Sequence, residues 1–128
     1  MIKIEGGIKG LIFDLDGTIA DTMPIHYIAW RDTAARNGID FPEKLFYDMA
    51  GVTLYAIARK LNEISGKNVD PIEMGDIKEA AYEQNLWKAK PITPILEIIK
   101  QNYGKLPMAV GTGGNSRYKN ILYICTLY

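Results

Sequence analysis

Residues 10–18 read GLIFDLDGT: an apolar run, two carboxylates one residue apart at Asp14 and Asp16, and a Gly-Thr turn. The apolar residues do not alternate with polar ones, so residues 9–16 are predicted to form a fully buried strand of a parallel sheet. In extended backbone the two acids point to one side. Such acids repel each other and lose hydration unless a cation or a proton joins them. The pattern therefore predicts a metal site at the end of this strand.

The same residue types are suited to phosphoryl transfer. Asp14 would attack phosphorus and form an aspartyl-phosphate, while Asp16 would protonate the leaving oxygen and later accept a proton from water. Mg²⁺ is the expected cofactor because it prefers oxygen ligands and offsets the repulsion between carboxylate and phosphate. Gly17 would allow a sharp turn that the Thr18 hydroxyl could fix. The alternative is an ordinary strand end followed by an Asp-Gly turn. The apolar strand followed by residues 14–18 and then by an acid-Thr pair at residues 21–22 is more specific, and it favours a catalytic site.

A second buried strand is predicted at residues 107–112, after a helix that begins at Thr93 and ends before Gly104. Thr112 and Gly113 follow it and offer a hydroxyl and unobstructed backbone N–H groups to a phosphate. Open α/β sheets bind ligands beyond the carboxyl ends of their strands, so Thr112 would lie beside Asp14 if the strands are neighbours. Read alone, residues 111–114 are better explained as a flexible turn, but their partnership with the acid motif favours a phosphate-binding role.

Four helices are predicted between the two strands, at about residues 24–37, 43–49, 54–66 and 70–88. Asp70 and Pro71 mark the start of the fourth, which is expected to continue through Ile72, Ile77 and Trp87 to about Lys88. Trp30 and Trp87 are predicted to lie in the core of this bundle rather than to serve as substrate platforms. Four helices can form a bundle with its own core.

The predicted fold is therefore α/β, with an incomplete, Rossmann-like parallel-sheet core and an inserted four-helix cap. Residues 1–22 and 91–128 would form the core, and residues 23–90 the cap. Residues 118–128 carry β-branched and aromatic side chains without a helical stripe, so strand and helix are equally supported there.

The composition of the chain limits the classes of partner that it is expected to bind. The chain has 128 residues, 48% of them hydrophobic, with 15 basic and 15 acidic side chains. Balanced charge gives no general case for binding nucleic acid or a membrane, but a small anionic substrate needs only local charge. The lone Cys125 cannot form an internal disulfide, and we expect neither a secretory leader nor a membrane-spanning helix. Cytoplasmic residence is expected.

Two basic residues of the helical segment are candidates for contacting an anionic substrate. His26, the sole histidine, follows Thr22, a candidate N-cap for the first helix. Lys88 falls at the end of the fourth predicted helix. A lone helical histidine is more often half-packed, and such a lysine is more often solvated or favourable to the helix C-terminus.

Residues 14–22, DLDGTIADT, resemble the first signature of the haloacid dehalogenase superfamily of phosphatases and phosphomutases. The continuation through His26 and Trp30, and residues 107–113, PMAVGTG, are similar to the branch that holds β-phosphoglucomutase and fructose-1-phosphate phosphatase-like enzymes. The resemblance covers about residues 9–117. It implies a Rossmann-like core, a mobile cap that excludes water when closed, and Mg²⁺-dependent chemistry on small phosphate esters.

The resemblance also implies roles for individual residues. Asp14 matches the nucleophile, whose carboxylate binds the metal, and Asp16 matches the acid/base residue, whose backbone carbonyl is a metal ligand. Thr112, with Gly113 beside it, matches the phosphate-binding second motif. Asn115 lies where the family varies and is expected to touch the substrate, while His26 and Lys88 match cap positions that approach the active site in the mutases.

Two departures from the family shape the functional prediction. Leu54 stands where the mutase has a phosphate-binding arginine, which favours a phosphatase and leaves a phosphomutase as a lesser alternative. No third-motif lysine or fourth-motif acidic pair is identified before Tyr128, and we expect a frameshifted or prematurely terminated gene.

The leading prediction is a phosphatase for small sugar phosphates with impaired turnover. The alternative is a non-catalytic remnant that binds phosphate or metal weakly, or self-associates through exposed core. A nucleotide-binding module is disfavoured because neither glycine-rich turn matches a dinucleotide fingerprint.

Overall fold

The computed structural model describes residues 2–113, so the predictions for Asn115 and residues 118–128 lie outside the described residues. These residues divide into two compact units. Residues 2–23 and 89–113 form the sheet unit, and Pro24–Lys88 form the helical unit. No helix among the described residues is long and apolar enough to cross a bilayer.

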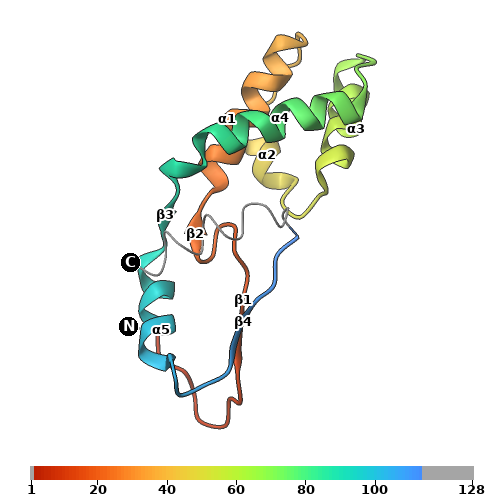
Figure 1. The fold of residues 1–128 in the computed structure, drawn as a ribbon. Coiled ribbons are helices and arrows are strands. Elements are labelled where there is room, and N and C mark those ends of the chain that lie inside the picture. The colour runs from red at the N-terminus through yellow and green to blue at the C-terminus, as the bar shows by residue number, and fades with distance from the viewer. Residues whose placement is uncertain (1, 114–128) are drawn as a thin grey trace. The chain divides into compact units, whose positions relative to one another are not determined.

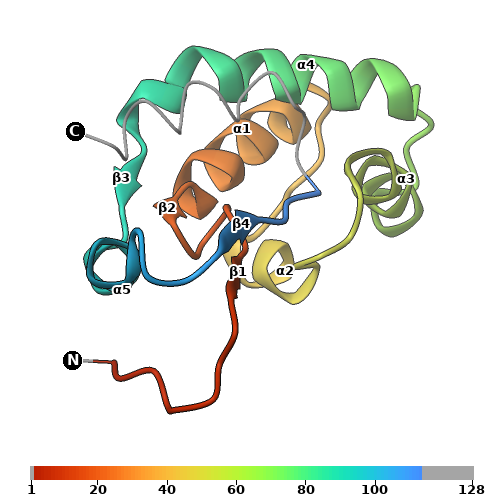
Figure 2. The same cartoon turned by 60° about the horizontal axis from the view of Figure 1, so that its bottom comes forward.

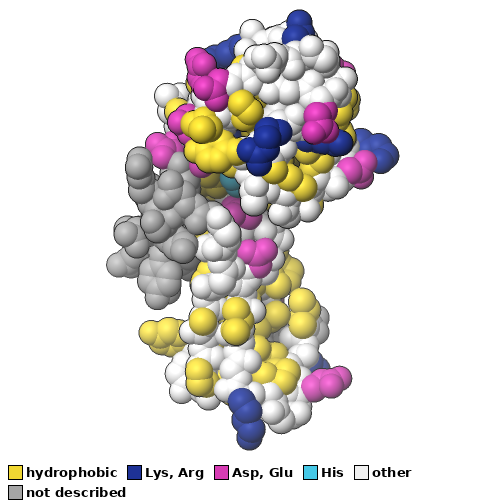
Figure 3. Space-filling model, turned by 90° about the vertical axis from the view of Figure 1, so that its right-hand side faces the viewer, with side chains coloured by type: hydrophobic (Ala, Val, Ile, Leu, Met, Phe, Trp, Pro, Cys, Tyr) yellow, Lys and Arg dark blue, Asp and Glu magenta, His cyan; other side chains and the backbone are white. Residues whose placement is uncertain are grey.

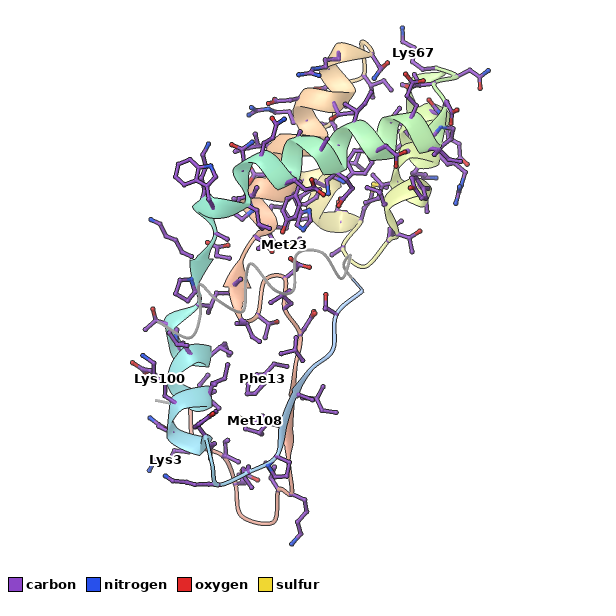
Figure 4. The ribbon with its side chains drawn as sticks, viewed as in Figure 1. Lys3, Phe13, Met23, Lys67, Lys100 and Met108 are labelled. Carbon is purple, nitrogen blue, oxygen red and sulfur yellow. The ribbon has the colours of Figure 1, made fainter. Side chains whose placement is uncertain are left out.

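The described part of the sheet unit contains a pair of parallel strands, a short antiparallel pair and one helix (Figure 1). Strand β1, Leu11–Phe13, pairs with β4, Met108–Val110, and Phe13 stands opposite Val110. Helix α5, Thr93–Asn102, precedes β4 in the chain. Phe13 and Met108 point from their strands toward α5 (Figure 4). The predicted α/β class with a parallel-sheet core is confirmed, and the described part of the sheet is small.

The prediction that both parallel strands are buried is wrong; in β4, Ala109 and Val110 are exposed. Ile12 is 82% exposed, while Phe13 is only half-buried. Successive side chains of a strand point to opposite faces of the sheet, so Ile12 lies on the face opposite Phe13. The continuous apolar run is suited to a strand covered on both faces, but in the described part of the chain one of these faces is open.

A short antiparallel pair flanks the helical insertion. Strand β2, Ala20–Asp21, pairs with β3, Lys90–Pro91. The amide of Ile92 extends the pairing by donating to the carbonyl of Ile19 at 2.9 Å. The chain therefore leaves the sheet unit after β2, forms the helices, and re-enters the sheet unit at β3.

The helical unit contains α1, Met23–Arg36, α2, Glu43–Asp48, α3, Leu54–Ser65, and α4, Pro71–Asn85, followed by the 3₁₀ turn η1, Leu86–Lys88 (Figure 2). Local signals set their ends. Asp70 caps α4 by accepting a hydrogen bond from the amide of Ile72 at 2.9 Å. Gly66 ends α3 with a φ of 69°, a left-handed conformation that glycine adopts without strain. The four predicted helices are confirmed.

Aromatic side chains form much of the core of the helical unit. Trp30 is 2% exposed and meets Phe41 edge to face, with ring centroids 6.1 Å apart. Phe41 makes a similar contact with Phe46 at 6.1 Å. The prediction of a core position for Trp30 is confirmed.

The prediction of a core position for Trp87 is wrong, and the isoleucines of α4 do not form its buried face. Ile72, Ile77 and Trp87 are 59%, 38% and 73% exposed. The buried face instead carries Met74, Gly75, Lys78 and Tyr82. Three of these follow the i, i+4, i+8 spacing of one helix face, whereas Ile72 and Ile77 do not. Trp87 lies beyond the α-helix, on the 3₁₀ turn η1, and hydrophobic side chains reach the surface of this unit (Figure 3).

Gly75 makes the close approach of α3 and α4 possible. A Cβ atom at this position would lie 2.7 and 2.8 Å from ring atoms of Tyr55. The Tyr55 hydroxyl donates to Asp76 at 2.9 Å, and this hydrogen bond raises the pKa of Tyr55. The ring is thus held against the glycine.

Gly75→Ala is therefore expected to destabilise the chain by about 1–2 kcal/mol, because displacing Tyr55 outweighs the gain in helix propensity. In a Tyr55→Ala background the same replacement should become neutral or stabilising. Urea unfolding followed by circular dichroism measures the four free energies of this cycle. Equal effects of Gly75→Ala in both backgrounds would contradict the steric explanation.

Candidate active site

The structure sets the two predicted motifs side by side. β1 and β4 are parallel neighbours, and the amide of Gly111 donates to the carbonyl of Phe13 at 2.8 Å. Asp14 directly follows β1, and Thr112 follows Gly111 at the end of β4. Adjacent strands lie about 4.8 Å apart. The carboxyl ends of two neighbouring strands therefore carry the acid motif and the Thr-Gly motif, as the sequence predicts.

A tight loop follows β1. The carbonyl of Leu15 accepts hydrogen bonds from the amides of Thr18, Ile19 and Ala20 at 3.2, 3.0 and 3.1 Å. Gly17 has a φ of 72°, and its amide donates to the carbonyl of Ala20 at 2.8 Å. The predicted sharp turn at Gly17 is confirmed, and it uses a backbone conformation that other residues rarely adopt.

The two acids have different hydrogen-bond partners. Asp14 is exposed, and its Oδ1 accepts from the amide of Leu15 at 2.7 Å. Asp16 is half-buried, and its Oδ1 accepts from the Thr22 hydroxyl at 2.5 Å. Thr22 is fully buried. It directly precedes α1 and orients Asp16, a role that the sequence analysis missed.

The oxygen atoms of these residues are of the type that binds Mg²⁺. Asp14 and Asp16 supply carboxylate and carbonyl oxygens, the donors that this ion prefers. Residues 2–113 contain no cluster of three or more His, Cys, Asp or Glu side chains that could hold a metal ion. The described residues at the end of β1 thus supply only some of the oxygen ligands that Mg²⁺ would need. Octahedral coordination would take further oxygens from water, substrate phosphate or other residues.

A cluster of polar and aromatic side chains joins α1 to α4 in the helical unit. Nζ of Lys78 lies 2.8 Å from Nδ1 of His26 and 2.7 Å from Oε1 of Glu79. The His26 ring stacks on Tyr82, with centroids 3.9 Å apart and planes 5° from parallel. His26 is therefore held by its contacts with Lys78 and Tyr82 and is half-buried.

Lys78 is the residue of this unit that sequence reasoning missed. It is 2% exposed, and its ammonium group also lies over the rings of Tyr82 and Trp30, at 4.9 and 5.7 Å from their centroids. Lys88, the lysine chosen from the sequence, is exposed, and its ammonium lies 5.5 Å from the centroid of Trp87. The signal for Lys78 was its position four residues after Met74 and four before Tyr82.

Comparison with known proteins agrees with this arrangement. The family model for haloacid dehalogenase-like hydrolases matches residues 11–122. Fructose-1-phosphate phosphatase YqaB from Escherichia coli is 35% identical over 107 residues, which cover 84% of this chain and 57% of that protein. An uncharacterised protein from Haemophilus influenzae is 33% identical over 122 residues, 94% of this chain and 60% of its own length.

Solved structures show the same fold. A β-phosphoglucomutase from Clostridium difficile is 25% identical and superposes with a TM-score of 0.68 over 93% of this chain and 56% of its own. A hydrolase from Pseudomonas syringae, at 18% identity, gives a TM-score of 0.78 over 94% of this chain and 57% of its own. The chain thus spans less than two thirds of the length of these relatives. Because the family model matches most of its sequence, the chain belongs to the haloacid dehalogenase-like hydrolases.

Proposed function

We propose that this chain carries the nucleophile half of a Mg²⁺-dependent phosphatase that hydrolyses small sugar phosphates through an aspartyl-phosphate at Asp14. The observation that carries the proposal is the hydrogen bond from Gly111 to Phe13, which aligns the carboxyl ends of β1 and β4. It brings Asp14 and the Thr112 segment to one edge of the sheet, where α/β proteins bind ligands.

Each residue would have a defined part in the reaction. A carboxylate oxygen of Asp14 attacks phosphorus, and the bond from phosphorus to the sugar oxygen breaks while Asp16 donates a proton to that oxygen. Asp16 then takes a proton from water, whose oxygen attacks phosphorus, so that orthophosphate leaves and Asp14 is restored. The Thr112 hydroxyl and the amide of Gly113 would hold the phosphate oxygens. Bound by the Asp14 carboxylate and the Asp16 carbonyl, Mg²⁺ would offset the charge of the phosphate.

The substrate class rests on the relatives and on residues of the helical unit. One relative is named a fructose-1-phosphate phosphatase and another a β-phosphoglucomutase, and both names specify a small sugar phosphate. Leu54, at the position of the arginine that the mutases use, supports hydrolysis over transfer to a second sugar oxygen. His26, Lys88 and Asn115 remain predicted substrate contacts, and we add Lys78 because it holds His26. Cytoplasmic residence also remains a prediction.

Metal removal tests the proposal directly. Purified chain is incubated with fructose-1-phosphate or p-nitrophenyl phosphate and Mg²⁺, and orthophosphate is measured with and without excess EDTA. We expect slow release that EDTA abolishes and added Mg²⁺ restores, because the charge on the phosphate is then no longer offset. Release that persists in EDTA, at the same rate, would contradict a Mg²⁺-dependent mechanism.

A non-catalytic remnant that self-associates is the second candidate, and the open face of the sheet supports it. Ile12 is 82% exposed beside an exposed Ala109, and such apolar surface favours association between copies. Sedimentation velocity across a concentration series separates the candidates. Association that Ile12→Lys abolishes, together with no orthophosphate release, would favour the remnant over the enzyme.

A further inference from the structure

Helix α1 is followed by a pair of residues whose amide groups can react with each other. Asn37 and Gly38 form the only asparagine-glycine pair in the chain. Asparagine is thermolabile, because its side-chain amide can be attacked by the backbone nitrogen of the next residue. Glycine has no side chain to hinder that attack. The pair is therefore a candidate site of chemical modification.

The fold holds the attacking nitrogen in a hydrogen bond. The amide of Gly38 donates to the carbonyl of Ala35 at 3.0 Å, and the amide of Ile39 donates to the carbonyl of Ala34 at 3.0 Å. Gly38 has a φ of 69°. These two bonds and the left-handed glycine form a Schellman motif, which closes the C-terminal end of α1. The nitrogen of Gly38 is thus part of the helix end.

The side chain of Asn37 is held on the preceding turn of the helix. Its Nδ2 donates to the carbonyl of Thr33 at 3.0 Å. Side chains of a helix lean toward its N-terminus, whereas the nitrogen of Gly38 follows Asn37 in the chain. The carboxamide is therefore bonded on the side away from the atom that would attack it.

We propose that Asn37 is a deamidation site that the end of α1 protects, and that it reacts only when this end opens. In the opened chain the nitrogen of Gly38 forms a bond to Cγ of Asn37. The carboxamide nitrogen leaves as ammonia and takes the amide proton of Gly38 with it. Water then opens the cyclic imide at either carbonyl, which yields aspartate or isoaspartate. Opening of one helix end costs less free energy than global unfolding, so the reaction can start in folded protein.

Isoaspartate would prevent the helix end from closing again in the same way. Its main chain runs through the side-chain carbon, so the backbone gains one atom between α1 and Ile39. Ile39 and Phe41 are 3% and 2% exposed, and Phe41 contacts Trp30. The added atom displaces these side chains from the core. The site is independent of the catalytic proposal, since all of these residues belong to the helical unit.

Peptide mass spectrometry of aged protein tests the proposal. The chain is incubated at mildly alkaline pH in buffer and in urea, and the tryptic peptide of residues 37–44 is analysed for acid in place of amide. Conversion in buffer should be at least about tenfold slower than in urea, because only the opened fraction reacts. Equal rates in buffer and urea would overturn the proposal.

Asn102 is the internal control in the same digest. Its Nδ2 makes the same kind of hydrogen bond, to the carbonyl of Ile98 at 2.8 Å, but the next residue is Tyr103. A bulky side chain hinders the attacking nitrogen, so Asn102 should react much more slowly than Asn37 in urea. Equal rates at the two asparagines in urea would show that Asn37 is not a preferred site.

Three variants separate the chemistry from the protection. Gly38→Ala places a methyl group beside the attacking nitrogen and should slow the reaction in urea about tenfold, whether or not this variant folds. Ile39→Ala removes the buried side chain that anchors the Schellman motif, and it should speed the reaction in buffer several-fold without changing the rate in urea. Met74→Ala removes a buried side chain of α4, so it controls for a general loss of stability. Equal acceleration in Met74→Ala and Ile39→Ala, or an unchanged rate of Gly38→Ala in urea, would overturn the proposal.

Discussion

Replacing Asp14 by Asn is expected to abolish phosphoryl transfer, lowering turnover by at least about a thousand-fold, because an amide oxygen is a poor nucleophile. The fold should be retained: Asp14 is exposed, and its Oδ1 accepts only a local hydrogen bond, from the amide of Leu15 at 2.7 Å, which an amide oxygen can also accept. A sensitive readout does not require full turnover. Wild-type chain mixed with acetyl phosphate and Mg²⁺ should gain the mass of one phosphoryl group, labile to hydroxylamine.

Asp21→Asn is the matched control for this experiment. Asp21 is an exposed carboxylate on β2, close in sequence to the acid motif, and the proposed mechanism gives it no role. The Asp21→Asn variant should be phosphorylated on Asp14 at the wild-type rate. Hydroxylamine-sensitive labelling that survives in Asp14→Asn would place the nucleophile elsewhere and would refute the assignment of Asp14.

Trp30→Ala is expected to have the largest effect on stability, about 3–5 kcal/mol, because it opens a cavity in the middle of the helical unit. Trp30 is 2% exposed and contributes the edge-to-face contact with Phe41. Its ring also faces the Lys78 ammonium at 5.7 Å, so truncation weakens the environment of a buried cation. A loss of this size is a large part of the total stability of a small protein.

Urea unfolding followed by far-ultraviolet circular dichroism measures this loss without relying on tryptophan fluorescence. Trp87→Ala is the control, because Trp87 is 73% exposed and its contact with Lys88 lies at the surface. Its effect should stay within about 1 kcal/mol. Similar effects of the two replacements would show that Trp30 is not the centre of this core.

Short-range signals in the sequence predicted much of the fold. The Asp70-Pro71 start of α4 and the Gly66 end of α3 depend on hydrogen bonds and backbone conformations within a few residues, so they could be read directly. The acid motif could also be read, because strand, turn and carboxylates are contiguous. Its juxtaposition with Thr112 required only that two parallel strands be neighbours.

Burial could not be read in the same way. The alternation of Ile12 and Phe13 is fixed by strand geometry, but which face is covered depends on elements distant in sequence. On α4, Ile72 and Ile77 are more apolar than Lys78, yet Lys78 is buried because His26, Glu79 and two aromatic rings offer its charge partners. Hydrophobicity alone does not contain that information.

The sequence by itself determined the class of fold, the order of helices and strands, and the residue types at the two strand ends, because these follow from local backbone preferences and periodicity. Only the tertiary structure decided that Thr22 holds Asp16, that Lys78 rather than Lys88 contacts His26, and that Ile12 stays exposed. These outcomes depend on which side chains meet across elements, and a pairwise contact between residues 26 and 78 leaves no pattern in a single chain.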